Sequence, residues 1–386
     1  MQLSTNRRRI AVILVAVVGI VAVLCIAVTA FFVISGRTSP LESIALQIRL
    51  RMAGDALNKP AGTDATPFCF VVNAGENAAT IANRLKAQGV ILDADLFSTY
   101  LRYFNLDSKL QAATYSLKRN LTIPQVAHVL TNPEESLITL RIIEGWRAEE
   151  IAALLDKTPG LIFKGADFLA LVSSSSPREA SVQEFAARNG IPQGRSLEGF
   201  LYPATYTHPA CGTAQSFLDQ MLNAFDRYVT AQMYADTRAK SMTMYQMVTM
   251  ASIIEREAVV EQERPTIASV YWNRYTNGIS ANPNPNVPTT LDADPTIQYA
   301  LGDTRTPGTW WPRITANDYR GVNSPYNTYL NVGLPPGPIA NPRVSSIQAA
   351  IYPAQTNYIY FRASCAADGT HQFAATFDEQ LANACS

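Results

Sequence analysis

The sequence has little of what metal and redox sites are built from. It contains three histidines, all far apart, and five cysteines with no Cys-x-x-Cys pair. We therefore predict no zinc cluster, no other metal site and no cofactor. Charge is also scarce and balanced, with 16% charged residues and 31 Lys plus Arg against 31 Asp plus Glu. This balance gives no indication of nucleic-acid binding.

At 386 residues the chain is long enough for two or three domains. Its 23 prolines and 17 tyrosines are typical of an extracytoplasmic protein with long ordered loops. Cys365 and Cys385 flank the last segment. They could form a disulfide in an oxidising compartment or stay as free buried thiols, and the sequence leaves both open.

Charge is absent from Ile10 to Ile34, a run long enough to span a bilayer. Three arginines precede it, which favours a cytoplasmic N-terminus and an extracytoplasmic remainder. A cleaved signal peptide is disfavoured because the run is too long and no Ala-x-Ala site follows. Cys25 is a poor lipoprotein cysteine because Leu24 precedes it. We predict a cytoplasmic tail (1–9) and one uncleaved transmembrane helix (10–34) in the cell (inner) membrane.

A juxtamembrane helix and linker (35–66) should follow, with the helix over 41–57. A small α+β unit (67–131) comes next. Its expected elements are a strand (68–72), a helix (77–88), a helix from Asp93 with Phe104 on its core side, a strand (113–117) and a helix (123–130). Strand, helix, helix, strand is an order that resembles a LysM-type glycan-binding module, and a packing or spacer domain is an equal alternative.

The pattern of residues 132–386 predicts a larger α+β domain. Its strands are expected at 137–143, 358–361 and 372–376, and its helices at 148–155, between 163 and 189, and at 217–228. Ile279 to Pro342 shows almost no periodicity. A loop region this long is usually functional or disordered, and its Tyr, Trp and X-Pro steps argue against disorder. They predict a walled groove with aromatic faces and amide or hydroxyl groups.

The central helix of this domain is predicted over Tyr245–Val259, because its residues are apolar almost all the way round. Pro265 and Gly278 bracket a partner helix over 266–277. The last turn of the central helix carries two acids, where a carboxylate opposes the helix dipole.

Geometry separates these two acids. Glu255 has small and mostly apolar neighbours one turn away, namely Ala251, Ser252, Ala258 and Val259. Glu257 neighbours Glu261 and is expected to face Arg256 and solvent. Glu255 is therefore the candidate for a carboxyl with a raised pKa, which a general acid needs near neutral pH. An acid that is solvated or paired with Arg256 is the alternative.

Several short motifs along the chain form an ordered set. They are Glu144-Gly145-Trp146, Glu198 to Pro203 with Thr205-Tyr206, Ala251 to Glu257, Val270 to Arg274, Asp294-Pro295-Thr296, Tyr326 to Tyr329, Gly333 to Ile339 and Gly369 to Phe373. In this order they resemble the endolytic murein transglycosylase, or YceG-like, family. The resemblance covers roughly Phe68 to the C-terminus, and the anchor and LysM-like unit match the family's layout.

The resemblance implies a lytic transglycosylase that cleaves MurNAc–GlcNAc β-1,4 bonds within peptidoglycan strands and leaves 1,6-anhydroMurNAc ends. It would thereby terminate glycan elongation, with glycan-polymerising synthases as possible partners. The first Glu of the Ala-Ser-Ile-x-Glu-x-Glu motif is the family's catalytic acid, here Glu255. The substrate-binding residues that we expect are Glu198, Tyr202, Asn273, Asp294, Tyr326, Asn327, Tyr329, Pro335, Pro336 and His371.

The chain departs from the family pattern at Asp292, which could contact sugar or supply a second carboxyl for a lysozyme-like hydrolysis. Segments 282–288 and 306–313 look like family-variable insertions. A non-catalytic peptidoglycan-binding partner of the wall-synthesis machinery is the competing hypothesis, which a buried acid argues against. An aminodeoxychorismate lyase is set aside, because Lys240 has no phosphate-binding glycine loop nearby to hold pyridoxal phosphate.

Overall fold

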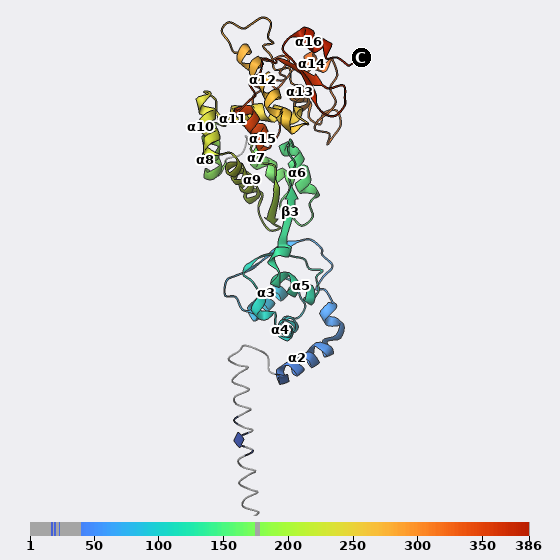
Figure 1. The fold of residues 1–386 in the computed structure, drawn as a ribbon. Helices are drawn as coiled ribbons and strands as arrows, with labels where there is room; N and C mark the ends of the chain where they lie inside the picture. The colour runs from blue at the N-terminus through green and yellow to red at the C-terminus, as the bar shows by residue number, and fades with distance from the viewer. Residues whose placement is uncertain (1–16, 18, 21–22, 24–39, 174–177, 386) are drawn as a thin grey trace, which may run out of the picture. The chain divides into compact units, whose positions relative to one another are not determined.

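The computed structural model describes residues 17, 19, 20, 23, 40–173 and 178–385 (Figure 1). The chain divides into two compact units, one ending at Leu137 and one starting at Ile138. Both mix helices and strands, which confirms the predicted α+β class. The predicted membrane span, 10–34, lies almost wholly outside the described residues. Within the described part of the chain, no helix combines the length and the apolar character that a membrane crossing needs.

The first unit contains the elements predicted for it. They are α2 (Pro40–Ala53), η1 (Gly54–Asn58), β1 (Phe68–Val72), α3 (Ala78–Ala87), α4 (Ala94–Tyr103), η2 (Asp107–Lys109), β2 (Ala113–Leu117), α5 (Ile123–Thr131) and η3 (Pro133–Ser136). Strands β1 and β2 pair antiparallel, with Phe70 opposite Tyr115. Helices α3, α4 and α5 bury their apolar faces with these two residues in one core.

Side-chain caps set where these helices begin. Asn77 accepts a hydrogen bond from the Thr80 amide at 2.9 Å and starts α3, and Asp93 starts α4 in the same way. One predicted core residue is wrong: Phe104 is 49% exposed. It follows the last residue of α4, and its ring packs beside those of Tyr100 and Tyr103.

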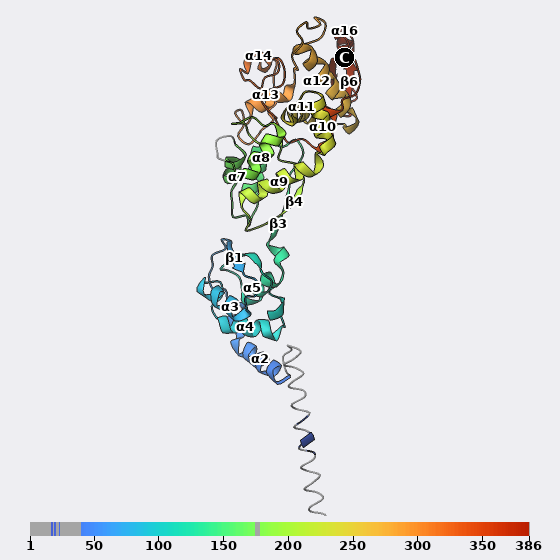
Figure 2. The same cartoon turned by 90° about the vertical axis from the view of Figure 1, so that its left-hand side faces the viewer.

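The second unit is larger and mostly helical. Its elements are β3 (Leu137–Arg141), α6 (Ala148–Lys157), α7 (Gly165–Val172), α8 (Ala180–Asn189), β4 (Thr205–Pro209), α9 (Ala214–Tyr228), α10 (Ala231–Ala239), α11 (Met244–Glu257), η4 (Glu261–Glu263), α12 (Arg264–Gly278), α13 (Asp294–Leu301), α14 (Asp318–Gly321), α15 (Val344–Ile351), β5 (Tyr360–Ala363), β6 (His371–Ala374) and α16 (Phe377–Ala382). Strands β3 and β4 form one pair, visible in Figure 2, and β5 and β6 form an antiparallel pair.

Helix α11 is the centre of this unit and packs against α10, α12, α13 and α15 (Figure 1). Every residue from Met244 to Glu255 except Gln246 is buried, as the apolar pattern predicted. Thr243 and Gln246 form a capping box that fixes the start of the helix. The tip of α11 is therefore held rigidly by its neighbours.

The long aperiodic region is partly helical, which corrects the prediction for 279–342. Asp294-Pro295 opens α13, and α14 is a single short turn. Helices α10 and α15 and strand β4 were also not predicted. Each is nine residues or shorter, so its hydrophobic pattern repeats too few times to stand out. Gly278 lies inside the end of α12 rather than after it.

The question of the two C-terminal cysteines has an answer in the structure. Cys365 and Cys385 form a disulfide, with their Cα atoms 5.4 Å apart. The bond closes a segment of the chain that contains β6 and α16.

Gly199→Ala tests how tightly the loop at 198–203 is fitted against α11. Gly199 has φ +90°, and an added Cβ would press into Pro338 and come within 2.8 Å of Val248 Cγ1. We expect a loss of about 3 kcal/mol in the unfolding free energy of the second unit, measured by urea denaturation. Gly308→Ala is the matched control, with φ +77° and open space around it, and should cost about 1 kcal/mol. Equal losses would contradict the close fit.

Candidate active site

Glu255 is surrounded by hydrogen-bond donors at the start of α15. The Arg343 side chain donates from Nε to Oε1 at 3.0 Å, and its backbone N–H donates to Oε2 at 3.1 Å. Ser346 Oγ donates to Oε2 at 2.8 Å, and Arg264 Nη1 lies 3.8 Å away. The small apolar surroundings expected for Glu255 are therefore wrong. It is a buried carboxylate that joins α11 to α12 and α15.

Glu257 lies two residues further along and meets different partners. Its carboxylate accepts a hydrogen bond from the Tyr271 hydroxyl at 2.8 Å. Burial raises the pKa of Glu257 to about 7, and the charge of Asp294 adds to the rise, whereas Tyr271 and Arg256 oppose it. Glu257 is half-buried, so it faces solvent less than expected. It is the acid of α11 whose proton exchanges near neutral pH.

Asp294 and Tyr329 form a bonded pair on the side of Glu257. The Tyr329 hydroxyl donates to Asp294 Oδ1 at 2.6 Å. Asp294 is the first residue of α13, which packs against α11. Of the predicted substrate residues, Asp294 is thus brought within electrostatic reach of Glu257, and Tyr329 is bonded to Asp294.

Asp292 has a structural role in this unit. Its Oδ2 atom pairs with Arg274 Nη1 at 2.9 Å, and its Oδ1 atom accepts from the Thr290 hydroxyl at 2.7 Å. Arg274 also donates to the carbonyls of Leu291 and Ile359. Both oxygens of Asp292 are therefore used in holding the loop before α13 against α12.

Asn341 is a buried junction that the sequence did not single out. Its Oδ1 accepts from the amides of Gly199 (2.8 Å) and Leu201 (2.9 Å), and its Nδ2 donates to Glu198 (2.7 Å) and the Trp146 carbonyl (3.0 Å). A fully buried Asn must satisfy all of these groups, so it ties three loops together. An Asn directly after the apolar pair 339–340 was the available signal.

Glu198 was predicted to contact substrate but lies in the core, 4% exposed. Besides Asn341 it accepts from the Ala148 amide at 3.0 Å, at the start of α6. Burial raises the pKa of Glu198 to about 8, helped by the charge of Glu149. In the structure, Glu198 therefore helps to hold the loops around Asn341 together.

Most of the other residues expected to bind substrate also make contacts within the protein. Tyr202 is buried and stacks on Tyr228 with ring centroids 4.4 Å apart. Asn327 is fully buried, with its amide on the carbonyls of Tyr319 and Val322. His371 pairs with Glu263 at 2.8 Å.

The proline turn and Tyr326 lie closer to α11. The Tyr245 hydroxyl, on α11, donates to the Pro336 carbonyl at 3.0 Å, which fixes the turn through Pro335 and Pro336. The half-buried Tyr326 packs on Tyr299, with ring centroids 4.8 Å apart. Among the described residues no group of three or more His, Cys, Asp or Glu side chains is placed to hold a metal ion.

A model of the YceG-like family matches residues 70–386. The chain belongs to the YceG-like family. This confirms the resemblance drawn from the ordered motifs.

Relatives in the family carry names that indicate an enzyme. An endolytic murein transglycosylase of Bacillus subtilis (strain 168) is 30% identical over 336 residues, which cover 84% of this chain and 86% of that protein. One of Streptococcus pneumoniae serotype 2 (strain D39) is 28% identical over 302 residues, 74% of this chain and 52% of that protein. A crystal structure of a yceG-like protein from Listeria monocytogenes has a TM-score of 0.51 and 30% identity, and the match covers 82% of this chain and 99% of that one.

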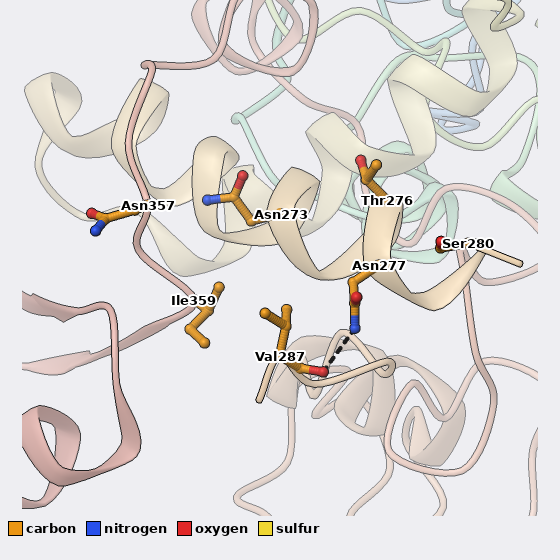
Figure 3. Close-up of a pocket in the computed structure, with 7 residues that line it drawn as sticks. All are labelled: Asn273, Thr276, Asn277, Ser280, Val287, Asn357 and Ile359. Atoms are coloured by element: carbon orange, nitrogen blue, oxygen red, sulfur yellow. Dashed lines mark hydrogen bonds between the residues drawn. The ribbon is translucent and has the colours of Figure 1, made fainter. Parts of the chain in front are cut away.

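Asn273, in the family motif on α12, lies at a separate pocket of about 430 Å³ (Figure 3). Its Nδ2 donates to the carbonyls of Thr356 and Tyr358 at 3.1 and 2.7 Å. Asn273 and Asn277 are two and six residues beyond Tyr271, which places them on the far side of α12 from the Tyr271–Glu257 contact. The structure therefore does not bring Asn273 together with the acids of α11. The wall at Val287 belongs to the 282–288 insertion.

Asn341→Ala tests the junction. The substitution leaves two backbone amides and one carboxyl without partners in the core, so we expect a loss of about 4 kcal/mol in unfolding free energy. Asn331→Ala is the control, because this exposed Asn also donates twice, to the carbonyls of Ser324 and Asn327. It should cost about 1 kcal/mol. Chemical denaturation of both variants measures the difference, and similar losses would argue against the junction.

Proposed function

We propose that this protein is an endolytic murein transglycosylase that cleaves MurNAc–GlcNAc β-1,4 bonds inside peptidoglycan strands and leaves 1,6-anhydroMurNAc ends. The observation that carries the proposal is a half-buried carboxyl with a pKa of about 7, that of Glu257, in the last turn of α11. A pure binding surface has no need of such a group. The names of relatives that match most of the chain support the same activity.

Glu257 is the stronger candidate for the proton donor. Glu255, which the family resemblance predicts, accepts hydrogen bonds from Arg343 and Ser346 on its two carboxylate oxygens, so its carboxyl is engaged in joining α11 to α15. Glu257 accepts a hydrogen bond from Tyr271 and is half-buried. The role of Glu255 as catalytic acid stays a prediction that the variants below test.

The mechanism uses one carboxyl twice. Protonated Glu257 gives its proton to the glycosidic oxygen as the bond to C1 of MurNAc breaks, leaving an oxocarbenium-like or N-acetyl-assisted intermediate. The resulting carboxylate then takes the proton of the C6 hydroxyl while O6 bonds to C1. No water is consumed, and Glu257 ends protonated. One acid suffices because the nucleophile belongs to the same sugar and is already close.

A lysozyme-like hydrolysis is the alternative that one observation favours. It needs a second carboxyl to activate water or form a covalent intermediate. Asp292 is committed to Arg274, but Asp294 lies within electrostatic reach of Glu257. Its bond to Tyr329 occupies Oδ1 and leaves Oδ2 available to a water molecule or a sugar. The products distinguish the reactions, because hydrolysis leaves reducing ends.

The rest of the architecture is part of the proposal. Residues 10–34 would anchor the protein in the membrane with the second unit outside. Residues 67–131 would be a LysM-like module that holds glycan, supported by the order β1, α3, α4, β2 with its antiparallel strand pair. Cleavage within nascent strands would terminate their elongation, which places glycan-polymerising synthases among the possible partners.

Glu257→Gln should abolish product formation, because the amide cannot donate the proton. We expect at least an about 100-fold loss of rate on purified peptidoglycan strands, with internal 1,6-anhydro ends counted by mass spectrometry. Glu184→Gln, an exposed acid on α8, is the control and should behave as wild type. If Glu255→Gln alone loses activity while its folding is intact, the acid is Glu255. Reducing ends from the wild type would favour the hydrolase, and binding without cleavage the non-catalytic alternative.

The rate should also fall as pH rises through about 7. Glu257 must be protonated to act, and its pKa of about 7 means that the protonated fraction drops tenfold per pH unit above that value. A pH profile of kcat/KM from pH 5 to 9 measures this basic limb. A profile that stays level to pH 9 would exclude Glu257 as the acid.

A further inference from the structure

Arg256 lies between the two acids of α11 and is half-buried. Burial lowers its pKa, against the charges of Glu150, Glu255 and Glu257. Its Nη1 donates to the Gly145 carbonyl at 3.4 Å, while its Nε is buried with no hydrogen-bond partner. A charged group with a buried N–H that has no hydrogen-bond partner needs another source of stabilisation.

Trp311 supplies it. The guanidinium carbon of Arg256 lies 3.8 Å from the centroid of the Trp311 ring, close enough for a strong cation–π contact. Trp311 belongs to the 306–313 insertion, which the family motifs do not include. The insertion thus supplies the aromatic ring that contacts Arg256 of α11.

The ring of Trp311 is itself held in place. Its indole N–H donates to Glu150 Oε2 at 3.0 Å, on α6. The carbonyl of Pro312 accepts from Gln298 of α13 at 3.0 Å. The insertion is therefore fastened to α6 and α13, so Trp311 is not a loosely placed surface residue.

The glycine of the Glu144-Gly145-Trp146 motif completes the arrangement. A Cβ on Gly145 would lie 3.2 Å from Arg256 Nη1 and 3.5 Å from Glu255 Cγ. Its φ of +75° is also left-handed, which favours glycine. Arg256 is thus enclosed by Gly145 and Trp311, and its guanidinium has little freedom to move away from Glu257.

We propose that Trp311 is a positioning residue that holds the charge of Arg256 beside Glu257 and so sets the pH range in which this acid keeps its proton. The inference rests on the proposed transglycosylase function and deepens it. It assigns a function to the 306–313 insertion. Through the contact of Trp311 with Arg256, the insertion would adjust the pKa of Glu257 on α11.

The sign of the effect follows from the charges around Glu257. Asp294 of α13 favours the protonated acid, whereas Arg256 and the hydroxyl of Tyr271 of α12 favour the carboxylate. Arg256 in turn faces Glu150 of α6 as well as the acids of its own helix. Without the Trp311 ring the guanidinium can turn to water, Glu257 loses its one opposing cation among these groups, and its pKa rises.

The test uses the full-length protein and the pH profile of 1,6-anhydro product formation. Trp311→Ala should move the basic limb up by about one pH unit, and Arg256→Gln should move it in the same direction by at least as much. Trp311→Phe keeps an aromatic face and should restore most of the wild-type profile. In Arg256→Gln, adding Trp311→Ala should move the limb no further, because both changes act through one charge.

Trp310→Ala is the matched control. This neighbouring ring lies over Arg147, at 5.2 Å, rather than over Arg256, so its loss should leave the limb in place. Thermal unfolding of every variant shows whether each is folded. A wild-type protein that makes no anhydro ends refutes the proposed function itself. An active wild type overturns only the inference if Trp311→Ala leaves the limb unmoved, moves it down through water entry, or adds to the shift of Arg256→Gln.

Discussion

Desolvation of charge at the end of α11 is the constraint on which the second unit depends. A buried carboxylate is costly unless other elements bring it donors. Glu255 accepts hydrogen bonds from Arg343 and Ser346 at the start of α15, and it pairs with Arg264 of α12. Satisfying one acid fixes the relative placement of three helices. These contacts hold the last turn of α11, and with it the neighbouring acid Glu257, in one place.

Asn341, two residues before Arg343, also joins separate parts of the second unit through hydrogen bonds. Asn341 binds the loops at 145–146 and 198–201. Gly145 in turn encloses Arg256, which lies next to both acids. Motifs far apart in the sequence are thus one connected support. This explains why several residues that look like substrate contacts in the sequence, such as Glu198 and Asn327, are buried in the structure.

The sequence predicts well where the pattern is long or the cap is explicit. Helix α11, the strands β1 and β2, and the starts of α3 and α4 at Asn77 and Asp93 all follow from local rules. It fails where tertiary contacts decide. The donors around Glu255 come from residues about 90 positions later, on a helix of eight residues with too weak a pattern to predict. The contact between Arg256 and Trp311 likewise joins segments whose pairing no local pattern shows.

The spacing of the two acids explains how a single helix end can serve both purposes. Residues two apart on an α-helix point about 200° from one another, so Glu255 and Glu257 cannot share surroundings. One turns toward α15 and is anchored by cations, whereas the other turns toward Tyr271 and Asp294 and has a raised pKa. A proton can then leave and return at Glu257 while the contacts that hold Glu255 stay in place. A mechanism that uses one carboxyl twice needs this separation, because the scaffold must not move when the acid becomes a base.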